Sequence, residues 1–154
     1  MSSNIVRLPD GPVCRVLIAH ERAMVRHALR TLIEAEDVVV VEVADGEAAL
    51  TELDGGRFDL LVLQLDLPEQ DGANVVLLHR LLLAHHQIPV EPPDVILTLP
   101  PEIRNNTAVA DRLRALGITE LIDDEPRSEV GALVEMILHA RLMRRNASGK
   151  PEAA

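Results

Sequence analysis

The sequence has almost no aromatic residues. Phe58 is the single one among 154 residues, and tryptophan and tyrosine are absent. Stacking of nucleic-acid bases and large aromatic anchors at binding surfaces are therefore largely excluded. Basic residues are also scarce, with 15 Lys and Arg against 25 Asp and Glu, which gives a formal net charge of -10. Because this charge repels phosphate backbones and anionic lipid surfaces, we expect no nucleic-acid partner and no membrane partner.

Cysteine and long apolar runs are equally rare. Cys14 is the only cysteine, so no internal disulfide can form, and its strand-like neighbours predict a core position. No apolar run reaches the roughly 20 residues that span a bilayer. The first twelve residues lack the apolar stretch of a signal peptide. We therefore expect a cytoplasmic protein.

The chain does contain short runs rich in valine, leucine and isoleucine, which alternate with segments of helical periodicity. Such runs are typical of strands buried on both faces of a sheet. The predicted strands are 13–19, 37–44, 58–65, 94–99 and 118–122. The predicted helices are about 24–34, 47–53, 73–85, 103–116 and 128–145.

Each connection between these strands carries a helix, so the strands must return as parallel neighbours. The pattern predicts an α/β fold, a doubly wound five-stranded parallel sheet with five helices. The length allows one core of this kind. We assign it to residues 13–145, with a flexible N-terminal segment at 1–12 and a disordered tail at 146–154.

Sites in such sheets form beyond the carboxyl ends of the strands, near the point where the strand order reverses. We expect four loops to converge there, and they carry polar and mostly acidic side chains. These are His20 and Glu21 after the first strand, Gln64 to Asp66 after the third, Thr98 after the fourth, and Asp123 to Glu125 after the fifth.

Five stretches, in order from about Cys14 to Leu142, resemble the receiver domain of two-component response regulators. They are RVLIAHERAMVRHAL, VEVADGEAAL, FDLLVLQLDLPEQDG, the ILT of 96–98 and RALGITELI. The resemblance implies a CheY-like, flavodoxin-like topology and a phosphorylatable aspartate at the end of the third strand. It also implies an acidic pair that holds magnesium, a threonine or serine after the fourth strand, and a lysine after the fifth.

Most of that chemistry is altered in this sequence. Gln64 stands at the phosphoacceptor position, and its neutral amide lacks the charged oxygen that attacks phosphorus. The acidic pair becomes His20 and Glu21, Asp124 stands at the lysine position, and Leu121 replaces the aromatic switch residue. Thr98 is kept. We expect no acyl phosphate at Gln64 and no cofactor beyond weak magnesium binding.

Other polar residues have a bland and a sharper interpretation. Asp66 could join Glu21 and His20 around a cation, but a solvated loop acid is the favoured interpretation, because a divalent ion needs several oxygen ligands in fixed geometry. His79, His85 and His86 lack the spacing of a metal site and are favoured as surface or helix-end residues. Asn105-Asn106-Thr107 matches a glycosylation acceptor, but without a secretory signal a turn or a helix start is the favoured interpretation.

These features predict a stand-alone, atypical receiver domain that acts by protein–protein interaction and is not an enzyme. The expected partner is a histidine kinase or another regulator, with a possible homodimer through the last two helices. A small-molecule sensor, in which a ligand replaces phosphate, is the alternative. A hydrolase or metal enzyme using His20, Glu21 and Asp66 is the least favoured, since no nucleophile and base are paired by spacing.

Overall fold

The computed structural model describes residues 13–87, 91–125 and 127–148. The predicted flexible segment 1–12 lies outside these ranges, as do residues 149–154 of the predicted tail. The strands are β1 (Cys14–Ala19), β2 (Val38–Val43), β3 (Leu60–Gln64), β4 (Asp94–Leu99) and β5 (Glu120–Asp123). The helices are α1 (Ala23–Ile33), α2 (Gly46–Gly55), α3 (Gly72–His85), α4 (Pro101–Arg104), α5 (Thr107–Ala115) and α6 (Ser128–Ser148).

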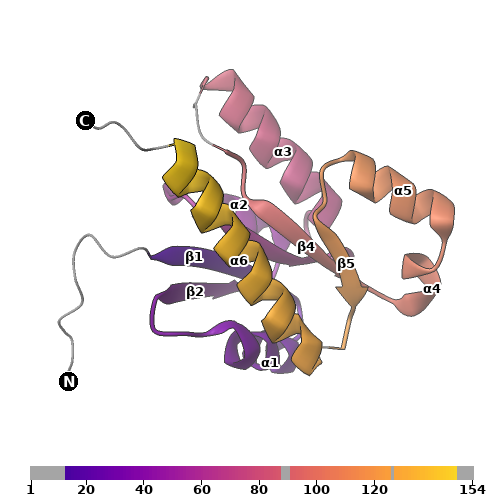
Figure 1. The fold of residues 1–154 in the computed structure, drawn as a ribbon. Coiled ribbons are helices and arrows are strands. Elements are labelled where there is room, and N and C mark those ends of the chain that lie inside the picture. The colour runs from indigo at the N-terminus through magenta and orange to yellow at the C-terminus, as the bar shows by residue number, and fades with distance from the viewer. Residues whose placement is uncertain (1–12, 88–90, 126, 149–154) are drawn as a thin grey trace, which may run out of the picture.

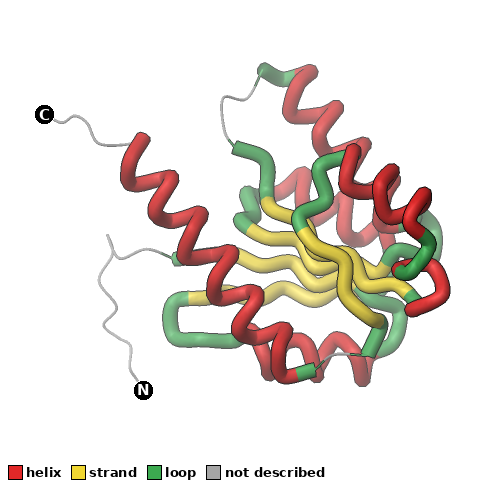
Figure 2. Tube along the Cα trace, turned by 45° about the vertical axis from the view of Figure 1, so that its right-hand side comes forward, coloured by secondary structure: helices red, strands yellow, loops and turns green. Residues whose placement is uncertain are grey.

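The strands form one sheet with the order β2-β1-β3-β4-β5, and every neighbouring pair is parallel. Helices cover both faces of this sheet (Figures 1 and 2). The predicted doubly wound parallel sheet is therefore confirmed. The strand order reverses between β1 and β3, so a crevice is expected beyond the carboxyl ends of these two strands.

Two aliphatic cores lie on the two faces of the sheet because alternate strand residues point to opposite sides. One core joins the sheet to α1 and α6, and Ile18, Val62 and Ile96 are its central strand residues. The other joins the sheet to α2, α3 and α5. Cys14 is 4% exposed and belongs to the first core, as its sequence neighbours predict.

The prediction of one helix over 103–116 is wrong in detail. The chain forms two helices there, α4 and α5. The described part of the chain therefore has six helices and not five. Asn106 has an extended backbone, and its side chain accepts a hydrogen bond from the Val109 N–H at 3.2 Å. This caps α5 and stops α4 one residue earlier, at Asn105. The favoured interpretation of 105–107 as a helix start is confirmed.

α6 is longer than predicted and is held at the beginnings of β3 and β4 by Arg141. This arginine is 5% exposed and donates to Asp59 Oδ1 at 3.2 Å and Asp94 Oδ2 at 3.3 Å. It also donates to the carbonyl oxygens of Pro92 and Glu91, each at 2.9 Å. A buried guanidinium needs such partners for its charge and its hydrogens. Within the described ranges, no helix has the length and apolarity needed to cross a bilayer.

Candidate functional site

The loops predicted to converge do meet at the carboxyl edge of the sheet. Ala19 is aligned with Leu63 and Gln64 with Thr98, so His20, Gln64 and Thr98 lie side by side at the ends of β1, β3 and β4. All three side chains are buried, at 0%, 6% and 1% exposed. Burial of three polar groups without a covering ligand is costly unless they are hydrogen-bonded. Their partners therefore define what the site can do.

Gln64 is bound twice by the neighbouring Glu21. The Gln64 Oε1 atom accepts the Glu21 backbone N–H at 3.0 Å, and Gln64 Nε2 donates to Glu21 Oε2 at 2.9 Å. Both ends of the amide are thus occupied by one residue of the β1–α1 loop. The buried Gln64 side chain thus links the end of β3 to the loop after β1.

His20 is completely buried beside this pair, and its ring is fixed by the chain that follows it. The Arg22 N–H donates to His20 Nδ1 at 3.1 Å. Nδ1 is therefore an acceptor, and in the neutral ring the hydrogen lies on Nε2. Burial lowers the pKa of His20 below its usual value of 6.5, and the attraction of Asp124 opposes this shift only in part. Arg26 Nη1 donates to the His20 carbonyl at 2.7 Å and holds the loop closed.

Asp124 reaches His20 from the end of β5. Its Oδ1 atom lies 3.7 Å from His20 Nε2, which is too long for a hydrogen bond, so the attraction between them is electrostatic. Within the described ranges, three buried side-chain polar atoms lack any hydrogen-bond partner. They are His20 Nε2, Asp124 Oδ1 and the hydroxyl oxygen of Thr98. All three atoms belong to residues predicted for this site.

Two further predicted residues do not join the pocket. Asp66 is exposed in the turn after β3, as expected for a solvated loop acid. Leu121 is 2% exposed and packs in the core under α2, α3 and α5. Thr98 alternates to the opposite face of the sheet, so the two predicted switch positions are separated by the sheet itself.

The magnesium site implied by the resemblance does not fit the residues that are present. The one carboxylate next to Gln64, that of Glu21, already accepts from the amide, and His20 turns an N–H toward Asp124. Among the residues that the structure describes, no three His, Cys, Asp or Glu side chains are grouped to hold a metal ion. Magnesium prefers several oxygen ligands in near-octahedral geometry. This pocket supplies too few oxygen donors of that kind.

The histidines of α3 divide into two environments. His85 and His86 are exposed at the end of the helix with their rings in edge contact, as predicted. The surface interpretation is wrong for His79, which is only 9% exposed. His79 lies near Leu53 and Leu83, beside the end of α2. It shares the buried side of α3 with Val75 and Val76, a spacing that could have signalled burial.

Arg22 and Arg26 are the residues of this site that sequence reasoning missed. Arg22 bonds His20 through its backbone N–H, a contact that no side-chain pattern reveals. Arg26 lies one turn after Arg22 on α1 and folds back to the loop. The sequence gives only one weak indication that Arg26 belongs to the site. It lies in the first turn of the helix that follows a strand ending at the pocket.

The family model and the similar solved structures all describe receiver domains. The family described as "Response regulator receiver domain" matches residues 16–110 of the chain. No curated protein matches the sequence significantly. The signal receiver domain of a putative LuxO repressor from Vibrio parahaemolyticus is similar in structure. The TM-score is 0.74 and the identity 17%, with 90% of this chain and 99% of that chain covered.

Two other solved structures are similar in fold. One is the signal receiver domain of the putative response regulator NarL from Mycobacterium tuberculosis, with a TM-score of 0.65, 20% identity, and coverage of 91% of this chain and 100% of that one. The other is the response regulator domain of Thermotoga maritima CheB, with a TM-score of 0.64, 21% identity, and coverage of 83% and 96%. At these identities the likeness concerns the fold.

Proposed function

Because this chain belongs to the response regulator receiver family, we propose that it works in two-component signalling through protein contacts and does not accept a phosphoryl group at the end of β3. The observation that carries this proposal is the double hydrogen bond between Gln64 and Glu21. In such a receiver the pocket is a fixed structural element, and the outer surface carries the signal.

The chemistry of the pocket supports the proposal. The nitrogen lone pair of the Gln64 amide is delocalised and its oxygen is neutral, so neither atom is a phosphoryl acceptor. Asp124 and Glu21 both bring negative charge toward the place where phosphate would sit. Two like charges about 4 Å apart repel by roughly 1 kcal/mol in water, and more where water is excluded.

Acetyl phosphate tests this proposal directly. The wild-type protein is incubated with acetyl phosphate and Mg²⁺, and its intact mass is measured. We expect no added phosphoryl group. Stable, magnesium-dependent phosphorylation of the wild type would overturn the proposal. The Asp66→Asn variant, measured in parallel, separates modification at the exposed Asp66 from modification elsewhere.

The contact surface that we propose lies on α6, with β5 and α5 beside it. Met136 and Met143 are 63% and 56% exposed, and the exposed Ala140 lies between them at helical spacing. This stripe is separate from the side of α6 that packs on the sheet through Val134 and Leu138. Exposed apolar stripes of this kind mark protein contacts. A histidine kinase, another regulator or a second copy is the partner that we propose, and a cytoplasmic location is part of this proposal.

Self-association can be tested with matched methionine variants. Sedimentation equilibrium of the wild type is compared with Met136→Glu and Met143→Glu. We expect a dimer that dissociates in both variants. Met24, 82% exposed on α1, is the control, and Met24→Glu should leave the mass unchanged. A wild type that stays monomeric at every concentration would exclude the homodimer and leave a different protein as the partner.

A second candidate function, ligand sensing at the altered pocket, is favoured by the three unpaired polar atoms. His20 Nε2, Asp124 Oδ1 and Thr98 Oγ1 are buried without hydrogen-bond partners, and a ligand that reached any of these atoms would supply a hydrogen bond that it lacks. Thermal-shift screening of metabolites against the wild type and Thr98→Val separates the two functions. Stabilisation that requires Thr98 supports the sensor, whereas the absence of any stabilising metabolite supports the contact surface.

A further inference from the structure

A cavity of about 430 Å³ lies between α1 and α6, and neither Met136 nor Met143 lines it. Its shape has a local cause in Gly131. A Cβ atom at this glycine would lie 3.0 Å from the Leu32 carbonyl oxygen, so the lack of a side chain lets α6 approach α1 closely. α1 ends at Ile33, whereas α6 continues to Ser148. The cavity opens where α6 has no helix beside it.

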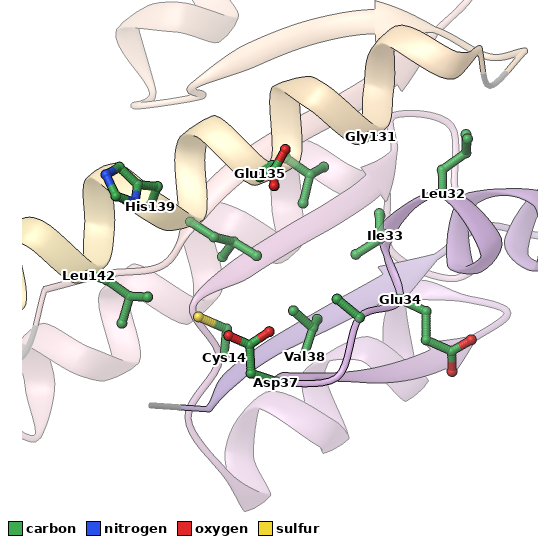
Figure 3. Close-up of a pocket in the computed structure, with 13 residues that line it drawn as sticks. Cys14, Leu32, Ile33, Glu34, Asp37, Val38, Gly131, Glu135, His139 and Leu142 are labelled. Carbon is green, nitrogen blue, oxygen red and sulfur yellow. The ribbon is translucent and has the colours of Figure 1, made fainter. Parts of the chain in front are cut away.

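The inner wall of this cavity is apolar. Ile33, Val38, Val134 and Leu138 line it, and three of these are less than 10% exposed while Val38 is half-buried. Figure 3 shows Cys14 and Val38 from the sheet on one side and Leu142 from α6 on the other. The volume falls at the small end of the roughly 300–1,000 Å³ of ligand sites, which are also mainly apolar.

The rim of the cavity is acidic. Asp37 and Glu135 stand on opposite sides of it, one in the turn before β2 and the other on α6 (Figure 3). Both are exposed, and no ion pair involves either of them among the described residues. A third carboxylate, Glu34, pairs with Arg30 at 3.3 Å. None of the 13 lining residues is Lys or Arg, and His139 is the only basic side chain.

The backbone holds the Asp37 carboxylate at this rim. The Asp37 carbonyl accepts the Cys14 N–H at 3.0 Å, which ties the turn to the beginning of β1. Two arginines are within electrostatic reach of Cys14, but both bind Asp59, Arg141 at 3.2 Å and Arg145 at closer range. Burial and the carboxylates of Asp59 and Asp37 raise the pKa of the Cys14 thiol, which therefore stays neutral and adds to the apolar wall.

We propose that this cavity binds a small organic cation, with an apolar body against Ile33, Val134 and Leu138 and an ammonium group between Asp37 and Glu135. The acidic rim favours a positively charged ligand, and the apolar wall favours a ligand with an apolar chain or ring. A carboxylate ligand of the same size would meet two unpaired acids and no cation. This site is separate from the pocket at the end of β3 and does not depend on the proposed function.

Titration of the ¹⁵N-labelled protein with hexylamine tests the proposal. We expect saturable shifts of backbone amide signals in 32–38 and 131–142. Hexanoate, of equal chain length and opposite charge, should produce none. Ethylamine should bind at least about tenfold more weakly than hexylamine, because it buries less apolar surface against the wall.

Charge variants locate the ammonium group. The Asp37→Asn, Glu135→Gln double variant should bind hexylamine about fivefold to tenfold more weakly, since it loses two solvent-exposed charge contacts. Glu52→Gln and Glu102→Gln, at acids on α2 and α4 that do not line the cavity, are the controls and should bind like the wild type. Thermal melts of all variants establish that they are folded.

Three results would overturn the proposal. The first is shifts that map to another face of the protein. The second is equal affinity for hexylamine and hexanoate, which would mean that the apolar wall acts without the acids. The third is a folded double variant that binds hexylamine as tightly as the wild type.

Discussion

The side chain of Gln64 joins β3 to the β1–α1 loop because it bonds both the backbone and the carboxylate of Glu21, at 3.0 and 2.9 Å. This residue pair occupies the crevice where the strand order reverses, the usual place for a ligand in sheets of this type. The pair therefore links the end of β3 to the loop after β1 through side-chain hydrogen bonds.

Removing the Gln64 amide should destabilise the protein. In Gln64→Ala the N–H and the carboxylate of Glu21 lose their partner and a side chain that is 6% exposed is removed, which costs about 2 kcal/mol of unfolding free energy. Urea denaturation measures this change. Gln70 is the control, because its amide bonds only Asn74 on the exposed surface, and Gln70→Ala should cost no more than about 0.5 kcal/mol. Equal costs for the two variants would contradict the role given to the Gln64–Glu21 pair.

Replacing Thr98 by valine should stabilise the protein. The Thr98 hydroxyl oxygen is buried without a hydrogen-bond partner, and valine has nearly the same shape without the polar atom. We expect Thr98→Val to raise the unfolding free energy by about 1 kcal/mol in the absence of ligand. A loss of stability of that size would mean that the hydroxyl has a partner in solution.

The stability of the protein should fall as the pH is lowered below about 6.5. Burial lowers the pKa of both His20 and His79 from that value, and the neighbouring Arg80 adds to the shift of His79. The unfolded chain then binds protons before the folded chain does, so acid favours unfolding. Denaturation at a series of pH values measures the slope.

Variants assign this pH dependence to its groups. Glu21, Arg22 and Asp124 surround His20, so replacing the histidine is a cleaner test than replacing any of them. His20→Asn and His79→Leu should each flatten the fall in stability between pH 6.5 and 5. His85→Asn, at the exposed end of α3, should keep the slope of the wild type. A slope that survives in both buried-histidine variants would point to other groups.

Arg141 should contribute far more to stability than its neighbour Arg144. Arg141→Ala leaves Asp59 and Asp94 without a buried cation and two carbonyl groups without a donor, a loss of about 3 kcal/mol or more. Arg144 is 47% exposed where it meets Glu91 and Asp94, and Arg144→Ala should cost at most about 1 kcal/mol. Thermal and urea denaturation of both variants compare them.

The fold could be predicted because the strands are short, β-branched and separated by helical segments. The predicted bounds of β4 match the structure, whereas the start of β1 and both ends of β2 differ from the prediction by one residue. The break between α4 and α5 was missed because one capping side chain, that of Asn106, decides it. A helical pattern over 103–116 cannot express that local competition.

The sequence predicts which residues lie at the site but not which hydrogen bonds they form. His20, Gln64, Thr98 and Asp124 meet because parallel strands end at one edge, which topology alone dictates. That Gln64 would bond Glu21 twice depends on rotamers and distances that residue types do not fix. The buried position of Arg141 was not predicted, although its spacing from Val134 and Leu138 places it on the buried side of α6.

The anchoring of Arg141 has a mechanical consequence. Asp59 and Asp94 stand at the start of β3 and β4, the two strands whose far ends carry Gln64 and Thr98. A tilt of the second half of α6 would have to break these contacts or carry the starts of both strands with it, because the Arg141 guanidinium is 5% exposed and bonded to both aspartates.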